Sequence, residues 1–137
     1  MYLYNLEGNN YKKMVENNKM IMIGVYQKNC VVSDLFIGCI NKVNELTNKN
    51  VVVCLIEKEE YLKNNEKNEK QIFPTLLVFN NSKIIKKIYQ KTVGNLDTYI
   101  QRMEDKEIKF WTKYNLVPPL KDSLLPFYQT IRSMFLL

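Results

Sequence analysis

The segment Gln71-Ile-Phe-Pro-Thr-Leu-Leu-Val-Phe79 decides the fold, because it places a proline directly before an apolar strand. Proline has no N–H to give to a sheet, so Pro74 must occupy the strand's first residue or a turn, where a cis peptide bond becomes possible. Earlier in the chain, Asn29-Cys30-Val-Val-Ser33 places a thiol between a buried strand and a helix, where backbone N–H groups and the helix dipole favour a thiolate. If the two segments meet in space, they form a thiol beside a proline-shaped groove that suits an extended peptide or another thiol.

The residues around the cysteine predict a strand, helix, strand unit. Residues 19–26 are apolar on both faces, which is expected of a central strand that is covered on each side. Apolar residues, Leu35 and Phe36 first among them, recur at helical spacing as far as Leu46, and residues 51–56 form a second continuous β-branched run. A connection of this length between two strands implies a right-handed parallel crossover.

The other predicted elements are short. The strand at residues 75–79 is joined by a turn at Asn80-Asn81 to an alternating strand at 83–90, which together predict a hairpin. We also expect a first strand at 2–6, a helix at 11–16, a marginal helix or charged connector at 57–71, and an amphipathic helix that carries the apolar residues of 96–103.

Composition excludes several classes of function. The chain has 137 residues, enough for one domain with its own core, and a net charge of +6 that is spread along the sequence. This spacing predicts a solvated surface rather than a nucleic-acid site. There is no histidine, and Cys30, Cys39 and Cys54 form no Cys-x-x-Cys pair, so we expect no metal site, no cofactor, and no Ser-His or Cys-His catalysis.

Several sequence features predict that the protein stays inside the cell. The first residues lack the basic and apolar regions of a signal peptide, and no apolar run approaches the roughly 20 residues of a membrane span. The sparse, odd number of cysteines suggests a reducing compartment. We therefore expect a protein that is cytoplasmic, or packaged in a particle assembled in the cytoplasm.

This order of elements resembles the thioredoxin family over roughly residues 2–103. Ile72-Phe-Pro-Thr-Leu-Leu-Val-Phe79 is similar to the family's segment around its cis-proline, and Cys30-Val-Val-Ser33 falls where the family keeps Cys-x-x-Cys. The resemblance implies an α/β, three-layer fold for residues 1–107, with a central mixed sheet of four or five strands flanked by helices. A C-terminal apolar helical extension, residues 108–137, follows it. The resemblance also implies a cis Pro74 and a substrate or peptide groove at Phe73, Pro74 and Thr75.

The departures from the family's pattern remove a dithiol cycle. Ser33 stands where the resolving cysteine would be, Asn29 replaces the usual tryptophan, and Val31-Val32 replaces Gly-Pro. Gly24 occupies the place of the family's buried aspartate, which is thought to help move protons.

Two interpretations of the thiol segment stay open. Cys30 is either a reactive monothiol, with Ser33 donating a hydrogen bond to its thiolate, or a remnant cysteine on a degenerate loop. Ser33 is either that donor or the N-cap of a helix that starts at Asp34. Cys39 and Cys54 lie in apolar patterns and are expected to be small core residues.

The apolar extension must pack somewhere, because burial of half a dozen such side chains contributes on the order of 10 kcal/mol. It packs either on its own domain or on a partner protein or second copy. We expect partner contacts from its large apolar residues, namely Trp111, Leu124, Phe127, Tyr128, Ile131 and Phe135.

Two functions follow. The first is a thioredoxin-like domain without dithiol redox activity that acts through its tail as a structural or binding component of a larger assembly, such as a large DNA virus particle. The alternative is an enzyme, a monothiol disulfide oxidoreductase or isomerase, in which Cys30 and Ser33 are the catalytic residues.

Overall fold

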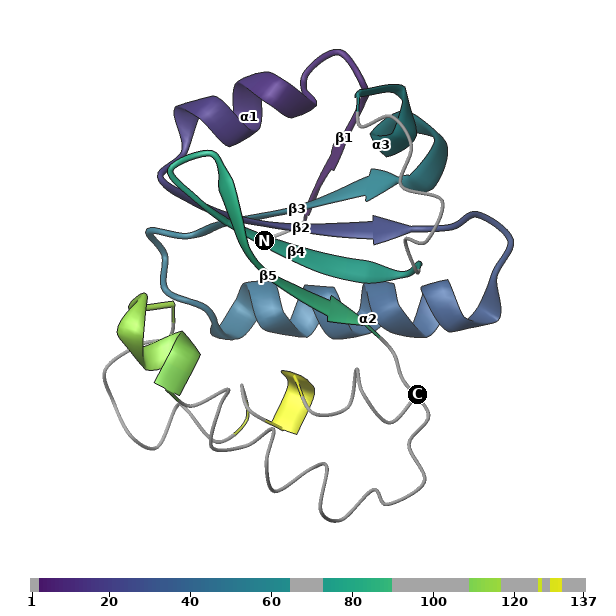
Figure 1. Ribbon diagram of the computed structural model, residues 1–137. Helices are drawn as coiled ribbons and strands as arrows, with labels where there is room; N and C mark the ends of the chain where they lie inside the picture. The colour runs from purple at the N-terminus through teal and green to yellow at the C-terminus, as the bar shows by residue number, and fades with distance from the viewer. Residues whose placement is uncertain (1–2, 65–72, 90–108, 117–125, 127–128, 132–137) are drawn as a thin grey trace.

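The computed structural model describes residues 3–64, 73–89, 109–116, 126 and 129–131. Five strands in these ranges form one mixed sheet in the order β1-β3-β2-β4-β5 (Figure 1). The strands are β1 (Tyr4–Leu6), β2 (Met20–Tyr26), β3 (Val52–Glu57), β4 (Thr75–Asn80) and β5 (Lys83–Tyr89). β1, β3 and β2 run parallel to one another, and β4 and β5 complete the sheet as an antiparallel hairpin.

Helices cover both faces of this sheet, as the sequence predicts. α1 (Tyr11–Asn17) and α3 (Lys58–Asn64) lie on one face, and the long α2 (Val31–Leu46) lies on the other (Figure 1). Alternate residues of β2 point to opposite faces. Ile21, Ile23 and Val25 therefore belong to the core beneath α1 and α3, while Met22 belongs to the core beneath α2.

The sheet register brings the Cys30 segment and the Pro74 segment to the same end of the sheet. β2 pairs with β4 so that Val25 is opposite Thr75, which places the end of β2 beside the start of β4. The Phe73–Pro74 peptide bond, directly before β4, is cis. The chain leaves β2 at Tyr26 and enters α2 after Cys30, so thiol and proline segment lie at the same end of the sheet (Figure 1).

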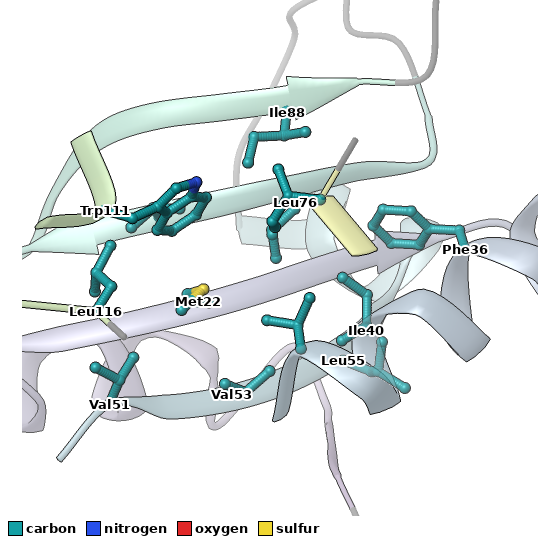
Figure 2. Close-up of a cluster of buried hydrophobic side chains, with 13 residues drawn as sticks. Met22, Phe36, Ile40, Val51, Val53, Leu55, Leu76, Ile88, Trp111 and Leu116 are labelled. Atoms are coloured by element: carbon teal, nitrogen blue, oxygen red, sulfur yellow. The ribbon is translucent and has the colours of Figure 1, made fainter. Parts of the chain in front are cut away.

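Part of the C-terminal extension belongs to the core of this domain. Trp111, Leu116 and Ile131 are completely buried in the cluster that also contains Met22 and Phe36. Figure 2 shows Trp111 and Leu116 among the side chains of the sheet strands. The backbone carbonyl of Leu116 also accepts a 2.9 Å hydrogen bond from the Asn48 N–H and a hydrogen bond from the Thr47 hydroxyl.

Trp111 and Ile131, which the sequence predicts at a partner contact, are thus buried in the core of their own chain. The physical reason is that α2 leaves apolar surface on its face of the sheet, and these side chains fill it. Four other residues expected at a partner contact, Leu124, Phe127, Tyr128 and Phe135, lie outside the described residues, as does the helix expected at 96–103. Within the described part of the chain, no helix is long and apolar enough to cross a bilayer.

Candidate thiol site

Cys30 is the N-cap of α2 and has extended backbone angles, with φ −126° and ψ 120°. Asn29 precedes it in the left-handed region, at φ 58°, which asparagine tolerates better than most residues. The Cys30 carbonyl accepts the N–H of Asp34 at 3.0 Å and so closes the first helical turn. The alternative in which Ser33 caps a helix that starts at Asp34 is therefore wrong. Val31 and Val32 have low helix propensity, so the sequence pattern does not show that the helix begins at Val31.

Ser33 lies inside that first turn and is completely buried. Its Oγ accepts the N–H of Gln27 at 3.0 Å, which ties the helix to the end of β2. The nearby Ser33 backbone N–H is the main reason why the pKa of Cys30 is lowered. The Ser33 hydroxyl and the Val32 N–H lower this pKa further, while partial burial and the charge of Asp34 oppose them.

The other two thiols are poor nucleophiles. Burial raises the pKa of Cys54 to about 12 and also raises that of Cys39. Cys54 is the buried core residue that the sequence predicts, whereas Cys39 is only half-buried on α2. All three cysteines are free, so Cys30 is the thiol that is suited to react.

Two of the three residues predicted to form a groove are buried in the domain. Pro74 is buried, and the buried Thr75 donates from Oγ1 to the Ile88 carbonyl at 3.2 Å. Phe73 is half-buried, with its ring 6.2 Å from that of Tyr61 and the Lys58 ammonium 5.4 Å from its centroid. Among these three residues, Phe73 offers the most accessible side chain, and a peptide groove remains a prediction.

The position of Gly24 is filled by hydrocarbon. A Cβ on Gly24 would lie 3.1 Å from side-chain atoms of Leu55 and Phe36 and 3.2 Å from Ile40. These distances are shorter than ordinary carbon contacts. The core beneath α2 therefore leaves no room for a carboxylate where the resemblance places the family's buried aspartate.

Exposed apolar side chains follow Cys30 along α2, and the sequence pattern did not reveal their exposure. Val31 is 75% exposed, Leu35 49% and Val32 37%, all in the first turns of α2. Helical spacing assigns Leu35 to the core, but the face of α2 that packs on the sheet is centred on Phe36, Ile40 and Val43. We call Val31, Val32 and Leu35 the α2 apolar patch. In the described ranges, no three Cys, Asp or Glu side chains are grouped to hold a metal ion.

Comparison with solved structures identifies the architecture. The oxidised thioredoxin from Plasmodium falciparum superposes with a TM-score of 0.56, over 77% of this chain and 98% of that one, at 13% sequence identity. The chain has a thioredoxin-like fold. Mitochondrial thioredoxin 3 from Saccharomyces cerevisiae (TM-score 0.52, 15% identity, 75% of this chain and 94% of that one) and the short form of spinach chloroplast thioredoxin f (0.53, 11%, 77% and 93%) agree.

The similarity to these thioredoxins shows the fold of the chain and no more specific property. No protein-family model and no curated protein matches the sequence. At identities of 11–15%, a shared fold does not transfer an activity, which must be argued from the site itself.

Proposed function

We propose that this thioredoxin-like protein forms mixed disulfides through Cys30 with cysteine-bearing segments of other proteins. The observation that carries the proposal is the position of Cys30 at the N-cap of α2, where the neighbouring Ser33 lowers the pKa of its thiol. Lowered thiol pKa, partial exposure and a helix N-terminus are the three properties that distinguish reactive cysteines from structural ones.

The chemistry is a thiol–disulfide exchange. The Cys30 thiolate attacks one sulfur of a partner's disulfide, the Cys30–partner S–S bond forms, and the original S–S bond breaks. Its electron pair leaves on the partner's second sulfur as a thiolate. A small external thiol such as glutathione then attacks the partner's sulfur, which releases Cys30 as a thiolate and leaves the partner glutathionylated.

Slow release is an expected property of this site. Ser33 has no sulfur with which to attack the mixed disulfide, and Cys54 is buried with a raised pKa. Cys39 lies nine positions along a helix that rises about 1.5 Å per residue, so it is far from Cys30 unless α2 opens. The site therefore favours capture of a partner over rapid reduction, with the α2 apolar patch contacting the captured chain.

The test is the pH dependence of Cys30 alkylation by iodoacetamide, followed by mass spectrometry of intact protein. We expect Cys30 to react with an apparent pKa below the ordinary value of about 8.5, and Cys30→Ser to abolish the fast phase. Alkylation with a pKa at or above that value would contradict the proposal.

A second function, a structural component of a larger assembly such as a virus particle, is favoured by the α2 apolar patch alone. An exposed apolar cluster can bind a partner without any covalent step. Capture of partners from native material, with and without reductant, separates the two functions. Partners lost with Cys30→Ser or with reductant indicate disulfide capture, whereas partners kept by Cys30→Ser and lost with Leu35→Asp indicate assembly.

A further inference from the structure

A second candidate site lies at the end of the sheet opposite Cys30. A cavity of about 450 Å³ is bordered there by the start of β2, the end of β4, the loop before β3 and the turn at residues 113–115. Its polar lining consists of Lys19, Asn48, Asn50, Asn80, Lys113 and Asn115, beside the ring of Tyr114. We propose that this cavity binds a small phosphorylated metabolite that carries hydroxyl groups.

Hydrogen bonds of the backbone and of the Asn48 side chain fix the walls of this cavity. Met20, the first residue of β2, pairs with Asn80, the last residue of β4, and the Asn81 N–H donates to the Lys19 carbonyl at 2.9 Å. On the other side, the Asn48 side chain accepts the Asn50 N–H at 3.1 Å and donates to the Asn115 carbonyl at 3.4 Å. These hydrogen bonds hold the described walls of the cavity in place in the folded domain.

The charge of the lining selects an anion. Lys19 and Lys113 line the cavity, and no aspartate or glutamate does among the described residues. Lysine is a point cation that binds phosphate well, and two lysines match its two negative charges. Lys113 is also held near Tyr114, with its ammonium 5.3 Å from the ring centroid.

The asparagines indicate that the anion carries hydroxyl groups. Asn80 lines the cavity, and its Oδ1 is buried without a hydrogen-bond partner in the part of the chain that the structure describes. A buried acceptor in that state is costly, and a turn of the Asn80 side chain toward a ligand hydroxyl would satisfy it. The Asn50 side chain supplies a further donor and acceptor of the kind that binds sugar hydroxyls.

Size and position separate this site from the thiol. A volume of about 450 Å³ is within the ordinary range for small-molecule sites and suits a sugar phosphate or mononucleotide rather than a polymer. β2 connects the two ends of the sheet, and its seven residues span about 20 Å. Binding at the cavity is therefore independent of Cys30 chemistry.

The experiment is a titration of the isotopically labelled full chain with ribose 5-phosphate, followed by NMR, with inorganic phosphate and ribose titrated separately. We expect shifts centred on Met20, Asn50, Asn80 and Tyr114, and tighter binding of ribose 5-phosphate than of either fragment. Lys19→Met/Lys113→Met should weaken binding about tenfold or more, while Lys87→Met, which changes an exposed lysine of β5 outside the cavity, should not.

A matched pair tests the asparagine without removing a lysine. Asn80→Asp preserves the size of the side chain but brings a carboxylate to the phosphate, so it should weaken binding more than Asn81→Asp, which makes the same change at the exposed neighbour. Equal effects of the two variants, equal affinity for inorganic phosphate, shifts centred elsewhere, or no saturable binding would each overturn the proposal. Circular dichroism of each variant confirms that the comparison is made between folded proteins.

Discussion

The hydroxyl oxygen of the buried Ser33 accepts the Gln27 N–H at 3.0 Å and so anchors α2 to β2. The backbone N–H and the hydroxyl group of the same serine lower the pKa of Cys30. Changes at Ser33 should therefore alter reactivity and stability together.

Ser33→Ala should raise the pKa of Cys30 toward its ordinary value and slow its alkylation near neutral pH. Stability should fall by about 1–3 kcal/mol, because the Gln27 N–H loses its acceptor. Alkylation rates across pH and urea unfolding measure the two effects. Thr112→Ala, an exposed site far from the thiol in sequence, is the control, and an unchanged Cys30 pKa in Ser33→Ala would remove the assigned role of the hydroxyl.

Ser33→Cys should speed the release of a partner from its mixed disulfide with Cys30. The new thiol would replace the hydroxyl group that now lowers the pKa of Cys30, within reach of a mixed disulfide. A mixed disulfide formed with a small reporter such as Ellman's reagent should persist in the natural protein and disappear quickly in Ser33→Cys, with an internal disulfide detected by mass. Equal lifetimes would show that more than a missing sulfur limits the cycle.

Cys54 should make the protein less stable in alkali. Its folded pKa is about 12 against 9.0, so its contribution is complete below pH 9 and is lost as pH rises toward 12. At pH 10.5 the loss amounts to about 2 kcal/mol. The loss of stability to urea between pH 8 and pH 10.5 should therefore be smaller by that amount in Cys54→Ala than in the natural protein. An equal loss in the two proteins would mean that the Cys54 thiol is more hydrated than its burial indicates.

Gly24→Ala should destabilise the fold by about 1–3 kcal/mol, because a methyl group there compresses Phe36, Ile40 and Leu55. Gly24→Asp should cost more, since it also buries a charge among hydrocarbon. Gly38 is the matched control, because nothing lies within 4 Å of a Cβ at that position of α2. Gly38→Ala should stabilise the helix by up to about 1 kcal/mol, and thermal unfolding should separate the two glycines.

Trp111→Ala should destabilise the domain by about 3–5 kcal/mol and Ile131→Ala by about 2–5 kcal/mol, because both side chains are completely buried. Lys109→Ala, at an exposed position of the same short helix as Trp111, is the control. Losses below about 1 kcal/mol would mean that these residues pack elsewhere, as a partner contact would require.

The strands were predictable because their signals are local. Apolar runs on both faces identified β2 and β3, and Pro74 marked the start of β4. The position of Cys30 at a helix N-terminus was also predictable, but the first helical residue was not, because valines favour strands and the helix depends on tertiary contacts such as the Ser33–Gln27 hydrogen bond.

The packing of the C-terminal extension, the exposure of Leu35 and the cavity could not be predicted, because they depend on contacts between residues far apart in the sequence. Nothing in the spacing of Trp111 and Ile131 reveals whether the surface they cover belongs to their own chain. The exposure of Leu35 follows from the rotation of α2 on the sheet, which periodicity fixes only to within neighbouring positions. The cavity bordered by Lys19, Asn80 and Lys113 joins residues from separate loops, and no local pattern connects them.

The burial of Ile131 beside Met22 has a consequence for biosynthesis. The sheet face that carries Met22 is complete only when a residue more than one hundred positions later has been made and released. Until then the nascent chain exposes apolar strands that pair readily with other chains. We therefore expect the domain to stay incompletely folded until this late segment has been made, and to depend on chaperones until then.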